Sequence, residues 1–451
     1  MKRLSPNTAA FILIVAFATL GTAKLVRDYS SGRSLQVHLN AGFSHPVLLG
    51  GTPQTAFIKI DLTGFRIERE KERTPVNLAL VLDKSGSMNG EKMDQAIAAT
   101  ITAVDHLQPG DVVSVIAYDN FAWVLMPATE VTDKQVIRER IRSLRAGGGT
   151  ALYAGVVEGA TQLREFLDPN RVNRVILLSD GQANNGPSSP SELGDLGAAL
   201  IEDGISVTTI GLGLGYNEDL MTQLALRSDG NHSFVEDVEN LAMIFDQEFG
   251  DVLSVVAQDV TVKIDLNEGI RPVRVLGREA EINGQQVTVK LNQLYSDQEK
   301  YVMLEVETSP SASAGEVEIA RVSTSYANMI TRDTDELRAT ISAQITDSEE
   351  IVQENIVAEP MVAAVEQQGI LNEEKAIALR DEGKVAEAEQ VLKDNAAYFE
   401  HNAGIYGDDK LLGGAEASRE AADMLGDRDW NQQRKAMRAD HYQGKVQQGG
   451  K

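Results

Sequence analysis

The chain arranges apolar and polar residues with two different periods, and the period changes twice. Residues 54–65 and much of residues 259–326 place apolar side chains near every second position, as half-buried β-strands do. Residues 76–253 instead alternate short apolar runs with longer segments of helical period, which is typical of βαβ units around a parallel sheet. The pattern therefore predicts an α/β region that lies between two groups of β-strands.

The α/β region opens with the apolar run VNLALVL, which begins at Val76 and is too short for a typical helix. Such a run suits a central strand whose two faces are both covered by helices. The further strands expected here are Asp111–Tyr118, Phe121–Pro127 at a sheet edge, Arg174–Ser179, Ser206–Gly211 and His232–Val235. The helices expected are Glu91–Leu107, Asp133–Leu144, Ala151–Phe166, Ser191–Asp203, Glu218–Arg227 and Val238–Leu253. We predict a mostly parallel sheet with helices on both faces.

The strands outside this region predict a second, all-β domain. Two early strands, Gln36–Phe43 and Gln54–Phe65, have no partners near them in the sequence. An ample set of short strands follows the α/β region: Asp259–Leu266, Pro272–Leu276, Gln286–Leu291, Lys300–Glu307 and Glu316–Tyr326. We therefore expect one β-sandwich, built from residues 34–75 and 255–332 and interrupted by an α/β domain at residues 76–253.

The remainder of the chain is predicted to consist of a helical region followed by a flexible tail. Within residues 333–426 we expect helices at Ser348–Gln368, Asn372–Arg380 and Lys384–Tyr398. The string KAIALRDEGKVAEAEQVLKDN resembles one tetratricopeptide unit, but a single copy cannot form a solenoid, so an ordinary helical hairpin is favoured. Residues 427–451 are polar and Gln-rich, and a flexible tail is predicted there.

The N-terminus has the features of an export signal. Lys2 and Arg3 precede an apolar run from Ala9 to Leu20, and small residues follow it up to Ala23. The run is shorter than the ~20 residues of a membrane span. We predict a signal peptide at residues 1–23; if it is not cleaved, residues 9–23 would anchor the protein. The chain contains no cysteine, so no disulfide supports an exported fold, which favours the periplasm or surface of a bacterium.

The strongly acidic composition restricts the class of partner. The formal net charge of −25 argues against binding to nucleic acid, which requires basic patches that displace counterions. It favours solubility and partners that are cationic or bridged by a metal ion.

Three segments with oxygen-bearing side chains follow strands or precede helices of the predicted sheet. The first contains Asp83, Ser85 and Ser87, the second Thr150 after a glycine run, and the third Asp180. The carboxyl ends of parallel strands lie at one edge of a sheet, where ligands gather. Hard oxygen donors suit Mg²⁺, with Ca²⁺ and Mn²⁺ as alternatives, rather than zinc or copper. Neutral hydroxyl ligands would leave the ion electrophilic, and an external carboxylate could then take a coordination position.

With these residues, the segment from Val76 to Leu253 resembles the von Willebrand factor type A domain. The metal-ion-dependent adhesion site of that family has an Asp-x-Ser-x-Ser loop, a threonine from a second loop and an aspartate from a third. The five matching positions are Asp83, Ser85, Ser87, Thr150 and Asp180. The resemblance implies a Rossmann-like fold, a divalent metal, and a protein ligand whose acidic side chain completes the coordination sphere. The layout of the flanking β segments is also similar to inter-alpha-trypsin-inhibitor heavy-chain-like and calcium-activated chloride-channel-like proteins.

Other interpretations of these residues remain open at this point. Aspartates also cap helices and close turns, and serines are common in glycine-rich loops. Asp119 lies at the same predicted edge, where a role in a turn is favoured over support of the site. The sequence has no HExxH, GxSxG or P-loop pattern, and Gly211–Gly215 lacks dinucleotide spacing.

These observations favour a non-enzymatic adhesion or assembly module. An accessory subunit of an envelope enzyme or transport complex is the alternative, because the same metal site could serve recognition there. A hydrolase is a third hypothesis.

Overall fold

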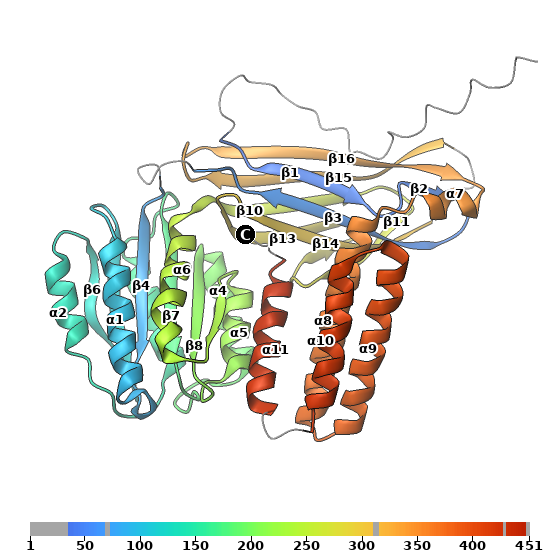
Figure 1. The fold of residues 1–451 in the computed structure, drawn as a ribbon. Helices are drawn as coiled ribbons and strands as arrows, with labels where there is room; N and C mark the ends of the chain where they lie inside the picture. The colour runs from blue at the N-terminus through green and yellow to red at the C-terminus, as the bar shows by residue number, and fades with distance from the viewer. Residues whose placement is uncertain (1–34, 68–72, 310–314, 427–429, 448–451) are drawn as a thin grey trace, which may run out of the picture.

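The computed structural model describes residues 35–67, 73–309, 315–426 and 430–447, and the predicted signal peptide lies outside these ranges. Three bodies make up the fold: an α/β domain, a pair of β-sheets and a group of C-terminal helices (Figure 1). Among the residues of these ranges, no helix is both long and apolar enough to cross a membrane.

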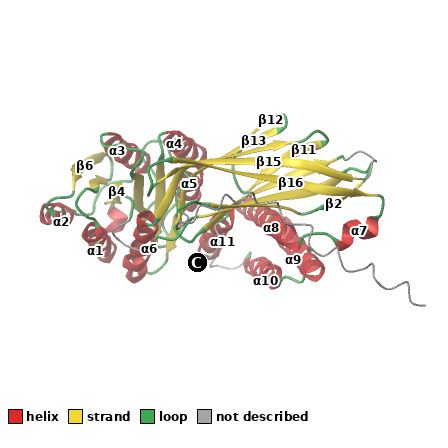
Figure 2. Ribbon diagram, turned by 90° about the horizontal axis from the view of Figure 1, so that it is seen from above, coloured by secondary structure: helices red, strands yellow, loops and turns green. Residues whose placement is uncertain are grey.

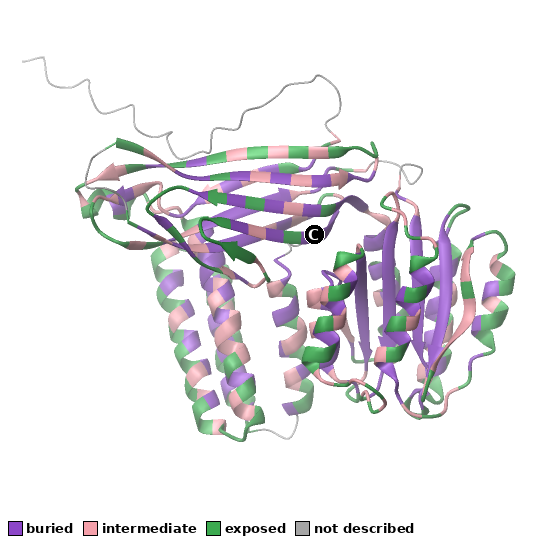
Figure 3. Ribbon diagram, turned by 180° about the vertical axis from the view of Figure 1, so that it is seen from behind, coloured by how far each residue is buried: buried purple, intermediate pink, exposed green. Residues whose placement is uncertain are grey.

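The α/β domain is built on a six-stranded sheet with the order β6-β5-β4-β7-β8-β9. The strands are β4 (Val76–Asp83), β5 (Val112–Tyr118), β6 (Ala122–Glu130), β7 (Val172–Ser179), β8 (Ile205–Leu212) and β9 (His232–Val235). All neighbours are parallel except β6, which runs antiparallel to β5 at the edge. The four central strands are buried along their whole length, as Figure 3 shows, because helices cover both faces.

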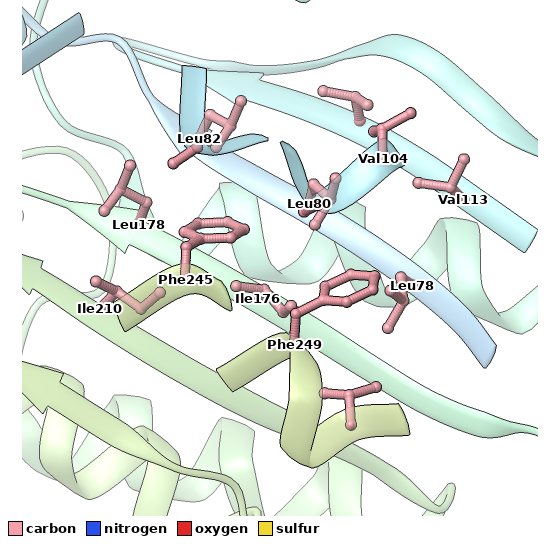
Figure 4. Close-up of a cluster of buried hydrophobic side chains, with 14 of the residues drawn as sticks. Leu78, Leu80, Leu82, Val104, Val113, Ile176, Leu178, Ile210, Phe245 and Phe249 are labelled. Carbon is pink, nitrogen blue, oxygen red and sulfur yellow. The ribbon is translucent and has the colours of Figure 1, made fainter. Parts of the chain in front are cut away.

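Alternate residues of β4 face two different helical layers. Leu78, Leu80 and Leu82 belong to a core shared with helices α1 (Glu91–His106), α2 (Lys134–Arg142) and α6 (Leu241–Leu253). Figure 4 shows Phe245 and Phe249 of α6 over this face. On the opposite face, Ala79 and Val81 pack with helices α3 (Leu152–Arg164), α4 (Pro190–Glu202) and α5 (Glu218–Arg227).

Helix α3 packs closely on the sheet at two glycines that face the strands. A Cβ atom at Gly159 would lie 2.7 Å from Val81 Cγ2, and one at Gly155 would lie 2.7 Å from Tyr118 Cδ1. Larger residues would push the helix outward, and the loop before it would move as well. These glycines therefore help to fix the loop that carries Thr150.

The strands on either side of the α/β domain form two packed sheets. A four-stranded sheet has the order β1-β3-β14-β11, and a six-stranded sheet has the order β12-β13-β10-β15-β16-β2. The strands before the α/β domain are β1 (His38–Phe43), β2 (Val47–Leu49) and β3 (Gln54–Thr63). Those after it are β10 (Val255–Leu266), β11 (Ile270–Leu276), β12 (Glu281–Asn283), β13 (Gln286–Tyr295), β14 (Glu299–Thr308), β15 (Gly315–Asn328) and β16 (Thr334–Thr346).

Chain segments far apart in the sequence meet in this β domain. Strand β3 pairs antiparallel with β14 over ten residues, and the two sheets enclose one apolar core. The chain enters and leaves the α/β domain at neighbouring points, because Thr74 Oγ1 donates to Val255 O over 3.0 Å. The two sheets extend to one side of the α/β domain (Figure 2). The predicted fold class, a Rossmann-like domain with additional strand sheets and a C-terminal helical region, is confirmed.

Strand β16 corrects the prediction that the chain becomes helical at residue 333. It pairs antiparallel with β15 and parallel with β2. Leu337, Ala339, Ile341 and Ala343 lie at every second position and pack on the core of the two sheets. This period-two signal is present in the sequence, but the acidic residues around it conceal it.

The C-terminal helices differ in number and bounds from the three that were predicted. They are α7 (Glu349–Glu354), α8 (Ala358–Asp381), α9 (Val385–Tyr406), α10 (Asp409–Met424) and α11 (Trp430–Lys445). Helix α8 is one continuous helix where two were predicted, and Ala363 and Ala364 on it pack against Leu276 and Met303 of the four-stranded sheet.

Helix α11 corrects the prediction of a flexible tail at residues 427–451. It lies between α5 of the α/β domain and the other C-terminal helices (Figure 1). Trp430, Met437 and Tyr442 are buried. Lys435 is only 4% exposed, and it pairs with Glu218 of α5. The polar composition of the segment hides this buried face, which exists only through tertiary contacts.

Candidate metal centre

The five predicted residues lie at one edge of the α/β sheet. Asp83 is the last residue of β4, and Asp180 directly follows the neighbouring strand β7. Ser85 and Ser87 lie on the turn after β4, where the short 3-10 helix η2 (Gly86–Met88) begins. Thr150 precedes helix α3. The edge is the one farther from the β domain, because β4 starts beside that domain and runs away from it (Figure 1).

Both carboxylate oxygens of Asp83 accept hydrogen bonds. The backbone N–H of Ser85 donates to Oδ1 over 2.8 Å, and Ser179 Oγ donates to Oδ2 over 2.7 Å. Asp83 is fully buried, and this burial raises the pKa of its carboxyl group, while its hydrogen bonds act in the opposite direction. The carboxylate of Asp83 is therefore held in one orientation.

The hydroxyls form a chain that leads to the second carboxylate. Ser85 Oγ lies 3.0 Å from Ser87 Oγ, and Ser87 Oγ donates to Asp180 Oδ1 over 2.7 Å. A methyl group placed on Gly181 would lie 3.2 Å from Thr150 Oγ1 and 3.5 Å from Ser87 Oγ. The structure therefore brings the five oxygen-bearing side chains together from three loops.

The Thr150 loop is held from both sides by backbone and amide groups. Thr150 N donates to Asn184 Oδ1 over 2.8 Å, and Asn184 N donates back to Thr150 O over 3.1 Å. Gly149 N donates to Asn120 Oδ1 over 2.9 Å. Ala151 N donates to the backbone oxygen of Asp119 over 2.6 Å. Asp119 thus anchors the loop through its backbone.

Two lysines near the site were not predicted. Lys84 pairs with the carboxylate of Asp119 over 2.7 Å and lies 4.5 Å from the ring centre of Trp123. Desolvation is the largest influence and raises the pKa of Asp119, but the hydrogen bond and charge of Lys84, together with backbone N–H groups of Asn120 and Phe121, lower that pKa in sum. Lys92, in the first turn of α1, forms an ion pair with Asp180 Oδ2. No local pattern indicates this pair, because it joins a helix to a loop that is distant in the sequence.

The donor set fits a hard divalent cation. It comprises two carboxylates and three hydroxyls, and oxygen ligands of this kind suit Mg²⁺, Ca²⁺ or Mn²⁺. Within the described ranges, no group of three or more His, Cys, Asp or Glu side chains is placed to hold a metal ion. The candidate metal centre is the mixed set of carboxylates and hydroxyls at this edge of the sheet.

Comparison with known proteins places this domain in a family. Residues 77–247 match the family model described as von Willebrand factor type A domain. An uncharacterised protein, sll0103, from Synechocystis sp. is 28% identical over 242 residues, which is 51% of this chain and 57% of that protein. Human inter-alpha-trypsin inhibitor heavy chain H2 is 31% identical over 173 residues, 36% of this chain and 18% of that protein. The chain thus spans about half the length, or less, of these curated relatives.

Two solved structures share the fold beyond this domain. A von Willebrand factor type A protein from Catenulispora acidiphila has a TM-score of 0.68 at 17% identity, covering 89% of this chain and 91% of its own. The ArnB paralog VWA2 from Sulfolobus acidocaldarius has a TM-score of 0.64 at 17% identity, covering 91% of this chain and 99% of its own. The predicted resemblance to inter-alpha-trypsin inhibitor heavy chains is also confirmed. Residues 77–247 of this chain are a von Willebrand factor type A domain.

Proposed function

We propose that the chain is an exported, non-enzymatic binding protein that engages a protein partner through a divalent cation, preferably Mg²⁺. Von Willebrand factor type A domains generally mediate protein–protein interaction or adhesion. In this proposal Ser85, Ser87 and Thr150 supply hydroxyl ligands, and Asp83 and Asp180 supply carboxylates. A carboxylate of the partner completes the coordination sphere.

One observation carries the proposal: three loops bring five oxygen-bearing side chains to one edge of the sheet, where Ser85, Ser87 and the buried carboxylate of Asp180 are joined by hydrogen bonds. Asp83 and Asp180 are 0% and 1% exposed, and Ser87 Oγ lies 2.7 Å from Asp180 Oδ1. Two buried carboxylates repel each other unless cations compensate them, and Lys92 supplies a single positive charge, which it places on Asp180. A divalent cation would supply that compensation, and its neutral hydroxyl ligands would leave it electrophilic towards a further carboxylate.

A protein is a more suitable partner than a nucleic acid because of charge. The chain has a formal net charge of −25, which opposes binding to a phosphate backbone. A carboxylate on a partner surface can approach only where a cation offsets this repulsion. Binding through the metal is therefore expected to depend on the cation.

The experiment is a pull-down from envelope extract with the full chain, with Mg²⁺ or with EDTA. The test variant is Thr150→Val, which removes a hydroxyl and little else. Thr161→Val is the matched control, because Thr161 is exposed on α3 and its hydroxyl only donates to Val157 O. We expect capture that is lost with EDTA and with Thr150→Val and is retained with Thr161→Val. Capture that is unchanged by EDTA and by Thr150→Val would contradict the proposal.

The captured protein also separates the two candidate roles. A surface or matrix protein would support adhesion or assembly. A subunit of an enzyme or transporter would identify the chain as an accessory subunit.

A further inference from the structure

Two exposed apolar side chains flank the candidate metal centre along the sheet edge. The strand order places the carboxyl ends of β5, β4, β7 and β8 side by side. Asp83 and Asp180 end the two inner strands of this row. Phe121 lies in the turn after β5, and Leu214 lies in the loop after β8. The two apolar residues are thus one strand beyond the site on either side.

Both side chains are open to solvent. Phe121 is 75% exposed and Leu214 is 50% exposed. Single exposed apolar residues are ordinary on protein surfaces. These two differ from scattered residues in that they lie on either side of the candidate metal centre, in the loops that follow β5 and β8.

The loop that carries Phe121 is tied directly to the site. Asn120, next to Phe121, accepts a hydrogen bond from Gly149 N over 2.9 Å, and Gly149 precedes Thr150. Asp119 N donates to Phe121 O over 2.9 Å and closes the turn. The backbone of Phe121 is therefore tied to the loop that carries Thr150.

The loop that carries Leu214 is tied to the other side of the site. A Cβ atom on Gly215 would lie 2.8 Å from the backbone oxygen of Asp180, so only glycine permits this approach. Gln182 Nε2 donates to Gly215 O over 2.9 Å. The backbone next to Leu214 therefore lies close to that of Asp180.

The spacing of the strands sets the length of ligand that fits. Neighbouring strands lie about 4.8 Å apart, so the three intervals from β5 to β8 span about 14 Å. In an extended peptide, residues two apart point to the same face, and each residue advances the chain by about 3.3 Å. Residues two before and two after a central position are therefore about 13 Å apart on one face. This length of about 13 Å is close to the span of about 14 Å between the ends of β5 and β8.

We infer that the partner presents an extended segment with a central acidic residue and an apolar residue two positions to either side. The central carboxylate reaches the metal centre, and the two apolar side chains contact Phe121 and Leu214. The inference rests on the proposed function and adds the sequence pattern of the ligand.

The test uses two displayed libraries of random heptapeptides, one with Glu and one with Gln fixed at the centre. Both are selected on the full chain in Mg²⁺ and eluted with EDTA. We expect the Glu library to be enriched over the Gln library, with apolar residues at the positions two before and two after Glu. A selected peptide should bind Phe121→Ser or Leu214→Ser about tenfold more weakly, since a lost apolar contact of this size is worth about one factor of ten.

Leu167→Ser is the matched control. Leu167 is 43% exposed and precedes β7, at the opposite edge of the same sheet. We expect this variant to bind the selected peptide like the wild type. Circular dichroism of all three variants checks that the fold is intact.

The outcomes separate this inference from the function on which it rests. If Glu has no advantage over Gln, the metal-bridged function is wrong, and the inference fails with it. If Glu is selected but the flanking positions show no apolar preference, only the inference fails. The inference alone also fails if peptides selected on the double variant Phe121→Ser/Leu214→Ser still show apolar residues at the flanking positions.

Discussion

The ammonium group of Lys92 forms an ion pair with Asp180 Oδ2, while Ser87 Oγ donates to Oδ1 of the same carboxylate. The side chain of Asp180 is fully buried, whereas that of Lys92 is 29% exposed. One carboxylate is thus shared between a hydroxyl of the candidate metal centre and a cation that the chain itself supplies. Lys92 places a positive charge where a divalent ion is proposed to bind.

Replacing Lys92 with Gln is expected to increase the affinity for divalent cations. The change removes a charge that repels the ion and competes for Asp180, so affinity should rise by about tenfold or more. Titration calorimetry with Mn²⁺ measures this directly. Lys134→Gln is the control, because Lys134 donates to Asp105 O in an exposed position on α2. Equal or weaker binding by Lys92→Gln would show that Lys92 does not compete with the ion.

Arg174 joins the two sheet-containing domains, and its replacement is expected to destabilise the protein. It is fully buried on β7, donates to Tyr295 Oη of β13 over 2.7 Å, and also bonds to Gln293. Arg174→Met leaves these groups without their donor, at a cost of about 3 kcal/mol in the free energy of unfolding. Urea unfolding measures the difference. The exposed Arg338→Met should change stability by less than about 1 kcal/mol, and equal effects would refute this account of Arg174.

Lys435 is expected to hold helix α11 on the α/β domain. It pairs with Glu218 and donates to Tyr216 O over 2.8 Å. Lys435→Met leaves the buried carboxylate of Glu218 with less compensation, so α11 should detach more often. Hydrogen exchange read by mass spectrometry should be faster in α11 of this variant. Arg419→Met is the control, since its ion pair with Glu400 is about half exposed, and unchanged exchange in Lys435→Met would contradict the prediction.

His232 is expected to make stability depend on pH below neutrality. Burial, reinforced by the charge of Lys435, lowers the pKa of His232 to about 3, against about 6.5 in the unfolded chain. The unfolded state therefore binds the proton more readily, and stability is lost as pH falls below about 6.5. The component from His232 amounts to about 2 kcal/mol between pH 7.5 and pH 5.

This component is measured as a difference between two unfolding curves. His232→Gln should lose about 2 kcal/mol less than the wild type between these two pH values. Other buried groups, such as Glu248, whose pKa is raised by burial, contribute equally to both proteins and cancel. His401→Gln, on exposed α9 surface, should behave like the wild type. Parallel curves for wild type and His232→Gln would exclude the role of His232.

The sequence was sufficient for those features that depend on local pattern. Apolar runs that end in turn residues located the central strands, and β4 ends at Asp83 as the run VNLALVLD indicates. Ser85 and Asp180 follow predicted strands, and Thr150 precedes a predicted helix. Their positions were therefore enough to predict that all three lie at one edge of the α/β sheet. Both signals are local or follow from parallel topology.

The features that the sequence did not reveal depend on contacts between distant segments. Helix α11 is stabilised by Glu218, more than two hundred residues before Lys435, and no local pattern marks such a pair. The ion pair of Lys92 with Asp180 likewise joins a helix and a loop that only the fold brings together. Strand β16 differs, because its period-two pattern was present but was outweighed by the acidic composition around it.

In the proposed function, one divalent cation is held by Asp83, Ser85, Ser87, Thr150 and Asp180. The most direct test is calorimetric titration of the full chain with Mn²⁺, followed by displacement with Mg²⁺. We predict one site in the wild type and in Thr161→Val, and its loss in Thr150→Val and in Asp83→Asn, which is similar in shape but uncharged. A wild type that binds no ion, or variants that bind as the wild type does, would contradict the claim.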